Sequence, residues 1–286
     1  MAHFGNYDEV RKDFNWSIGE KELEYQDGNT INIGWYCSDR ICQMGKADKT
    51  ALIWEGLGGK SKSYTYDELR IRSNVIGKFL REQGVKAEDR VCLFMDKVPE
   101  LYIGFLGTLK IGAIAQPLFS AFGDESLFVR LDNAQTSAII TQRKHLAKVR
   151  KIVDRLPSLK LIIVVDHDGK KKLKENEIPF DMDGEDPVEE LEIHPTNAES
   201  GSVLHYTSGT TGQPKGVKHV HYSLISQYLT TKWVLDIHDN DVYWCTADPG
   251  WVTGISYGVL APLAAGLILR VVEVTILGAA PQSQGG

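Results

Sequence analysis

The chain has 286 residues, of which 42% are hydrophobic and 24% charged, and its formal net charge is −6. This length and composition are those of a globular protein with a substantial buried core. The acidic balance, with a sequence pI near 5.8, argues against general binding of nucleic acid, which favours a basic face. The polar start of the chain does not resemble a secretion signal, and no apolar run approaches the roughly 18 residues of a membrane span. We therefore expect a cytoplasmic protein with no membrane partner.

The first 165 residues predict an α/β fold. Residues 1–48 are polar and irregular, a strand is expected over 51–55, and a helix follows over 66–83, where Thr65 and Glu68 have the spacing of a capping box. Apolar runs then alternate with amphipathic stretches, which predicts strands over 90–95, 114–118, 137–141 and 159–165, and helices over 99–111, 125–133 and 144–156. Near-continuous apolar strands separated by helices are typical of a doubly wound, largely parallel sheet with helices on both faces.

Residues 166–200 are acidic and contain glycine and proline, so we expect an excursion between two parts of one fold. Regular patterning then resumes with a strand over 202–206 and a helix over 222–234. Between these two elements lies a ten-residue loop, 207–216, with three glycines, four hydroxyl side chains and a lysine. A strand, a glycine-rich turn and a helix form a suitable setting for a phosphate, because glycines let backbone N–H groups converge on an anion.

The order of residues in this loop is more specific than its composition, which alone also fits an ordinary surface loop. The loop lacks the Gly-Lys-Ser/Thr ending of a Walker A motif. Thr207 to Gly216 reads Thr-Ser-Gly-Thr-Thr-Gly-Gln-Pro-Lys-Gly, which resembles without departure the motif of the adenylate-forming superfamily of acyl-CoA synthetases, luciferases and peptide-synthetase adenylation domains. The resemblance implies that the loop closes over the ATP phosphates through Thr207, Ser208, Gly209, Thr210, Thr211, Gly212 and Lys215, with Thr210 and Lys215 as catalytic candidates. Such donors would meet the negative charge of departing pyrophosphate.

A second motif narrows the resemblance within the superfamily. Thr246 to Gly254 reads Thr-Ala-Asp-Pro-Gly-Trp-Val-Thr-Gly, which closely resembles the AMP-forming acetyl-CoA synthetase group. In that group this segment lines the acyl pocket, and a bulky indole at the position of Trp251 keeps the pocket short. Trp251, Val252 and Thr253 are therefore the acyl-pocket candidates. A tryptophan flanked by glycines is otherwise most often a core residue.

Two basic residues are candidates for CoA binding. The resemblance points to the region after the third strand of the alternating series, where Arg143 and Lys144 could meet the CoA phosphates. A solvated basic patch at a helix start is the alternative for this pair. We expect no metal site in the protein itself: His205, His219 and His221 lie close in sequence, but no carboxylate or cysteine completes a ligand spacing. The four cysteines are expected to be free thiols: Cys37, Cys42, Cys92 and Cys245.

The resemblance also implies segments that this chain does not contain. Family members continue with a Tyr-x-x-Thr-Glu segment whose glutamate helps to hold Mg²⁺, an aspartate that binds the ribose, and a small C-terminal domain with an essential lysine. None of these occurs before Gly286, and residues 267–286 diverge from the family pattern. We therefore expect an N-terminal extension (1–48), a partial AMP-binding domain (49–266) and a divergent tail (267–286), without the C-terminal domain.

The resemblance implies a ligase that converts acetate or propionate, ATP and CoA to acyl-CoA, AMP and pyrophosphate through an acyl-adenylate. Adenylation requires the carboxylate, the α-phosphate and charge-neutralising groups to be held together. Since this chain lacks part of that machinery, we expect it to be largely inactive alone. A non-catalytic nucleotide- or acyl-binding remnant and a ligase for another short or medium-chain acid are the alternatives.

Overall fold

The computed structural model describes residues 3, 5–26, 28–169, 172–182, 184–207 and 212–273. Its helices are α1 (Tyr7–Asp13), α2 (Ser17–Glu22), α3 (Ile33–Tyr36), α4 (Asp39–Ile41), α5 (Tyr66–Glu82), α6 (Pro99–Lys110), α7 (Asp124–Ala134), α8 (Leu146–Ile152), α9 (Ser223–Val234), α10 (Val252–Ile255) and α11 (Ala261–Ala264). Its strands are β1 (Thr50–Glu55), β2 (Ser61–Thr65), β3 (Arg90–Phe94), β4 (Ile114–Pro117), β5 (Ala138–Thr141), β6 (Leu161–Val164), β7 (Glu177–Pro179), β8 (Gly201–Thr207), β9 (Lys215–Val220), β10 (Val242–Tyr243) and β11 (Ile268–Val272). None of the described helices is both long and apolar enough to cross a membrane.

A seven-stranded sheet forms the centre of the molecule, in the order β7-β6-β5-β3-β4-β8-β9. Its first six strands are mutually parallel, and β9 pairs antiparallel with β8. The predicted parallel sheet is therefore confirmed. Two strands of this sheet were not expected: β7 lies within the acidic excursion, and β9 turns the exit of the glycine-rich loop into a hairpin.

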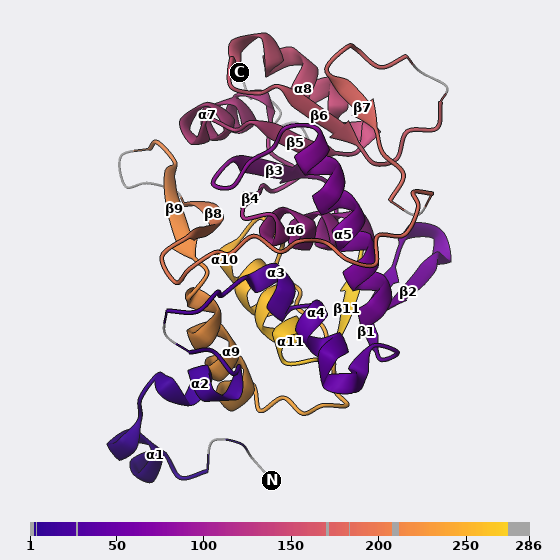
Figure 1. Cartoon of the computed structure of the whole chain (residues 1–286). Helices are drawn as coiled ribbons and strands as arrows, with labels where there is room; N and C mark the ends of the chain where they lie inside the picture. The colour runs from indigo at the N-terminus through magenta and orange to yellow at the C-terminus, as the bar shows by residue number, and fades with distance from the viewer. Residues whose placement is uncertain are drawn as a thin grey trace, which may run out of the picture.

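Helices cover both faces of this sheet, as the sequence predicts. Successive residues of β3 alternate between two apolar clusters: Val91 and Leu93 pack with α5 and α6, and Cys92 and Phe94 pack with α7 and α8. Figure 1 shows α7 and α8 on one side of the sheet and α5 and α6 on the other. Both faces are buried because strand side chains point alternately to opposite sides. This is why the strands read as near-continuous apolar runs.

A second, smaller sheet lies beside the first, in the order β10-β11-β1-β2. The predicted strand over 51–55 is β1 of this sheet, where it pairs antiparallel with β2 and parallel with β11. Residues 61–65 form β2, and α5 then begins with the expected capping box: the Thr65 hydroxyl accepts from the Glu68 N–H at 3.1 Å, and the Glu68 carboxylate accepts from the Thr65 N–H at 2.7 Å.

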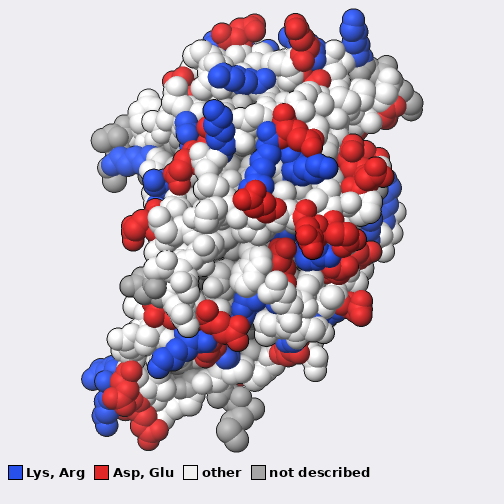
Figure 2. Space-filling view, in the orientation of Figure 1, with Lys and Arg blue, Asp and Glu red and all other residues white. Residues whose placement is uncertain are grey.

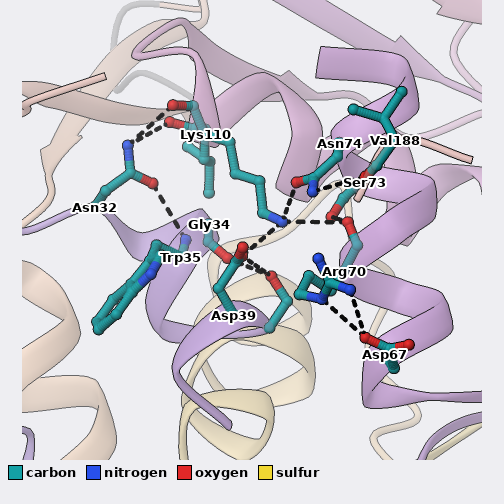
Figure 3. Close-up of polar contacts among 12 residues, drawn as sticks. Asn32, Gly34, Trp35, Asp39, Asp67, Arg70, Ser73, Asn74, Lys110 and Val188 are labelled. Atoms are coloured by element: carbon teal, nitrogen blue, oxygen red, sulfur yellow. Dashed lines mark hydrogen bonds and ion pairs between the residues drawn. The ribbon is translucent and has the colours of Figure 1, made fainter. Parts of the chain in front are cut away.

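The segment before β1 joins the core through a buried ion pair (Figure 3). Lys110, at the end of α6, is fully buried, and its Nζ lies 2.6 Å from Asp39 Oδ2 and 2.7 Å from Asn74 Oδ1. Gly34 in α3 packs on α6 so closely that a Cβ would lie 2.7 Å from the Leu106 carbonyl oxygen. These contacts place residues 31–41 within the core, whereas α1 buries none of its residues.

Charge on the molecular surface is mixed. On the face drawn in Figure 2, Lys and Arg side chains lie interspersed with Asp and Glu side chains rather than in one basic field. Several charged side chains of the described residues are paired, including Lys151 with Asp124 at 2.7 Å and Arg155 with Glu125 at 2.6 Å. This face therefore lacks, among its described residues, the extended basic surface that nucleic acids favour.

Candidate active site

The glycine-rich loop is held at both ends by the β8–β9 hairpin. Thr207, the last residue of β8, is paired in register with Lys215, the first residue of β9. Both residues are exposed, and Gly212 has φ +83°, a conformation that favours glycine. Ser208, Gly209, Thr210 and Thr211 lie outside the described residues. The structure thus places Thr207 and Lys215 side by side at the base of the predicted phosphate loop.

This loop leaves the sheet at the edge where ligands bind in doubly wound folds. The strand β8 is the parallel neighbour of β4, and β4 is the parallel neighbour of β3. The carboxyl ends of these strands therefore meet at one edge, and the crevice outside such an edge is the usual ligand site. Lys97 follows β3, Phe119 follows β4 and Arg143 follows β5, so all three stand at the same edge as the phosphate loop.

The predicted acyl segment packs against this edge. The backbone of Gly250 lies so close to Phe119 that a Cβ at position 250 would come within 2.5 Å of the Phe119 nitrogen. The next residue, Trp251, is 48% exposed, and its ring centroid lies 6.4 Å from that of Phe119. Val252 and Thr253 form the first turn of α10, with Val252 partly buried and Thr253 exposed.

Trp251 ends a tight turn that begins at Asp248. The Asp248 carboxylate accepts a hydrogen bond from the Gly250 N–H at 2.8 Å, and its carbonyl accepts from the Trp251 N–H at 3.0 Å. Burial raises the pKa of Asp248, while the Gly250 N–H and the charge of Lys97 oppose this rise. A Cβ at Gly254 would lie 2.0 Å from the Asp248 carbonyl oxygen, so the first turn of α10 also needs glycine for close packing.

The two candidate CoA cations are both paired with carboxylates. Arg143 forms an ion pair with Asp168, and Lys144 forms one with Asp96 and a longer one, 3.6 Å, with Glu273. Burial raises the pKa of Asp96, but hydrogen bonds from His145, Lys144 and Ser120 outweigh it and hold that pKa well below its usual range. Arg143 and Lys144 thus stand at the predicted sheet edge within a charge-balanced network.

The three histidines near the loop, His205, His219 and His221, are buried or partly buried. His221 Nδ1 accepts a hydrogen bond from the Ile33 N–H at 3.1 Å. His205 and His219 meet edge to face, with ring centroids 5.6 Å apart. Burial lowers the pKa of His205 to about 3.

Among the described residues, the side chains close enough together to share a metal ion are His3, Asp236 and His238, which lie elsewhere on the surface. The cysteines Cys37, Cys42, Cys92 and Cys245 are free, as predicted.

Reasoning from sequence missed two residues that this edge brings to the acyl segment. Phe119 supports Gly250, and the Lys97 ammonium donates to the carbonyls of Thr246 and Ala247. Their positions in the sequence could have indicated both residues, because each follows a predicted parallel strand, and functional side chains gather at the carboxyl ends of such strands.

Several known proteins are similar to this chain over most of its length. The model of the family described as AMP-binding enzyme matches residues 40–281. Similar curated proteins include acetyl-coenzyme A synthetase of Bacillus subtilis, 40% identical over 90% of this chain and 44% of its own length, and that of Deinococcus radiodurans, 33% identical over 93% of this chain and 44% of its own length. The crystal structure of Brucella canis acyl-CoA synthetase superposes with a TM-score of 0.84 at 26% identity, covering 94% of this chain and 48% of that one.

The chain thus spans less than half the length of each of these relatives. The residues matched by the family model contain the central sheet, the hairpin that holds the predicted phosphate loop, and the predicted acyl segment packed on Phe119. The family match covers most of the chain and includes all of these features. The chain therefore belongs to the AMP-binding enzyme family.

Proposed function

We propose that this chain is part of an AMP-forming acetyl-CoA synthetase. In this reaction, an oxygen of the acetate carboxylate attacks the α-phosphorus of ATP, and pyrophosphate leaves as acetyl-AMP forms. The CoA thiol then attacks the acetyl carbonyl and releases AMP. One observation carries the proposal: the loop that begins at Thr207 and ends at Lys215 leaves the same sheet edge on which Gly250 and Trp251 pack.

The proposed roles follow from position. The loop residues Thr207 to Lys215 hold the ATP phosphates, where N–H groups, hydroxyls and one ammonium group stabilise the charge of leaving pyrophosphate. Lys215 and Thr210 are the proposed catalytic members. Trp251, Val252 and Thr253 line the acyl pocket, and the indole limits its depth to acetate or propionate. Arg143 and Lys144 contact CoA phosphates, which would replace the carboxylates that they now face.

Magnesium is the cofactor expected for the ATP substrate. Among the described loop residues, 207 and 212–216, none has a carboxylate, the side chain through which proteins most often hold Mg²⁺. We propose that Mg²⁺ arrives bound to the ATP phosphates.

The domain limits (1–48, 49–266 and 267–286) and the cytoplasmic location predicted from the sequence stay predictions. The strand β11 lies within the third of these ranges.

Acetate-dependent exchange of pyrophosphate into ATP tests the proposal. We would replace the matching part of the Bacillus subtilis acetyl-coenzyme A synthetase by this chain, and call the product the chimera. The chimera should exchange pyrophosphate with acetate or propionate, whereas this chain alone, at high concentration, should not. Lys215→Ala should reduce the exchange at least 100-fold, since one lost charge-stabilising donor costs about 10²–10³ in rate.

Lys218→Ala is the matched control, because Lys218 lies on the same strand and is also exposed. It should leave the rate within about twofold of the unsubstituted chimera, as expected for a surface side chain outside the site. A folded chimera that exchanges with neither acid would refute the proposed function. Exchange by this chain alone would refute only the expectation that it is inactive by itself.

A further inference from the structure

Lys97 bridges the central sheet and the acyl segment. It lies three residues beyond the end of β3, and its Nζ donates hydrogen bonds to the carbonyl oxygens of Thr246 (3.1 Å) and Ala247 (3.2 Å). Its own carbonyl accepts from the indole N–H of Trp54 at 2.9 Å. The lysine thus joins β1 of the smaller sheet, the end of β3 and the segment that leads to Asp248. Hydrogen bonds from a charged donor are among the stronger ones in proteins.

The base from which Lys97 extends is firmly held. The Asp96 N–H donates to Gln142 Oε1 at 2.9 Å, and the Asp96 carboxylate pairs with Lys144 and with His145 Nε2, the latter at 2.9 Å. These contacts tie the turn after β3 to the turn after β5. Lys97 therefore reaches the acyl segment from a backbone that is fixed on both sides.

The acyl segment is held at two points. One is the pair of carbonyls that accept from Lys97, and the other is the contact of Gly250 with Phe119. Trp251 follows directly after the second point and is half exposed, so its neighbours rather than deep burial fix its position. Lys97 is partly buried and has no other hydrogen-bond or ion-pair acceptor for its ammonium among the residues that the structure describes.

We infer that Lys97 is a positioning residue for the acyl pocket: its two hydrogen bonds hold the backbone of Thr246 and Ala247 and thereby set the place of the Trp251 indole. The positioning role concerns this chain's own structure, and its consequence for acid selectivity rests on the proposed function. Loss of the ammonium frees the segment before Asp248, and the pocket then distinguishes chain lengths less well, because small displacements of a positioning group impair selective binding.

Hydrogen exchange measured by mass spectrometry on this chain tests the positioning role without any substrate. Lys97→Met removes both hydrogen bonds and keeps a similar stem. The amides of Gly250 and Trp251, which donate within the Asp248 turn, should exchange about tenfold faster, the equivalent of about 1.4 kcal/mol. Amides of β3 and β5 should be unchanged, which shows that the fold persists. Lys97→Arg should restore most of the protection, and Lys160→Met, at the opposite edge of the sheet, should have no effect.

The chimera tests the consequence. Lys97→Met should lower the ratio of kcat/KM for acetate to that for butyrate about tenfold in pyrophosphate exchange, while the KM for ATP stays within twofold. Unchanged exchange at Gly250 and Trp251 would overturn the positioning role. Faster amide exchange with unchanged selectivity would overturn its link to the pocket. If the unsubstituted chimera has no activity toward any acid, the proposed function is rejected. The amide measurement on this chain would still decide the role of Lys97.

Discussion

Gly250 and Phe119 are in backbone contact, and this contact places the acyl segment on the edge of the central sheet. The Phe119 nitrogen would lie 2.5 Å, and its Cα 2.8 Å, from a Cβ at position 250. Both atoms belong to the backbone, so no rotation of a side chain relieves the clash. Position 250 therefore requires glycine for close approach rather than for an unusual φ.

Gly250→Ala should push the acyl segment away from β4 and reduce acetate-dependent pyrophosphate exchange in the chimera at least tenfold. The free energy of unfolding should fall by about 1–3 kcal/mol, the usual cost of overpacking. Gly123→Ala is the matched control, since a Cβ there meets nothing within 4 Å. Urea titration and the exchange assay measure the two effects. An alanine variant with the activity and stability of the parent would show that the segment does not need this contact.

Trp251→Gly should extend the range of acids that the chimera accepts. Removing the indole leaves space beside Phe119, whose ring lies 6.4 Å away, so valerate should gain relative to acetate by about tenfold or more. Trp244→Gly provides the control, because Trp244 is similarly exposed and lies in the same stretch of chain. Rates of pyrophosphate exchange with a series of straight-chain acids measure the change. Equal selectivity in the Trp251 and Trp244 variants would remove Trp251 from the acyl pocket.

The sequence predicted the central sheet well because its inner strands are short and mostly apolar, with β6 (Leu161–Val164) an unbroken apolar run. It did not predict β9, whose six residues Lys215–Val220 include two lysines, a glycine and a histidine, and four of which are exposed. A polar edge strand of this kind carries no period that separates it from a loop. The strand β7 has only three residues and also lacks a readable period.

The site was predictable only as separate motifs. Thr207, Lys215 and Trp251 stand out in the sequence because of the order of residues around them. The contact of Gly250 with Phe119 depends on how β4 is placed in the sheet, and the reach of Lys97 depends on the turn after β3. Such contacts join segments far apart in the chain, so no local pattern contains them.

Removing one partner of the buried ion pair between Lys110 and Asp39 should destabilise the fold strongly. Asp39→Asn leaves the fully buried ammonium without its carboxylate, which should lower the free energy of unfolding by about 3–5 kcal/mol. In the double variant with Lys110→Met, most of this loss should be recovered, because no buried charge is then left unpaired. Asp154→Asn, at an exposed position, serves as the control. Urea denaturation measures all of them, and a loss below about 1 kcal/mol for Asp39→Asn would contradict this account.

The buried histidine His205 should make stability depend on pH. Burial lowers its pKa from 6.5 to about 3, so between these values the unfolded chain binds a proton that the folded chain excludes. The free energy of unfolding therefore rises with pH across this window: the contribution is fully present above pH 6.5 and is lost as pH falls toward 3, by at most about 1.4 kcal/mol per pH unit. His221, whose pKa burial also lowers to about 3, should add a second contribution of the same sign.

His205→Phe removes one of these two titrations and should flatten the fall in stability between pH 6.5 and 4. Val234→Phe, which places the same ring at an exposed position that carries no titrating group, should leave the slope unchanged. Urea denaturation at half-unit steps of pH gives the slope for each variant, and the comparison needs only slopes, so a constant change in stability caused by the phenylalanine cancels. Equal slopes for His205→Phe and the unsubstituted chain would mean that His205 takes up a proton in the folded state as readily as in the unfolded one. A shallower slope for His205→Phe alone would identify this histidine, two residues before Thr207 on β8, as a group that the fold keeps neutral.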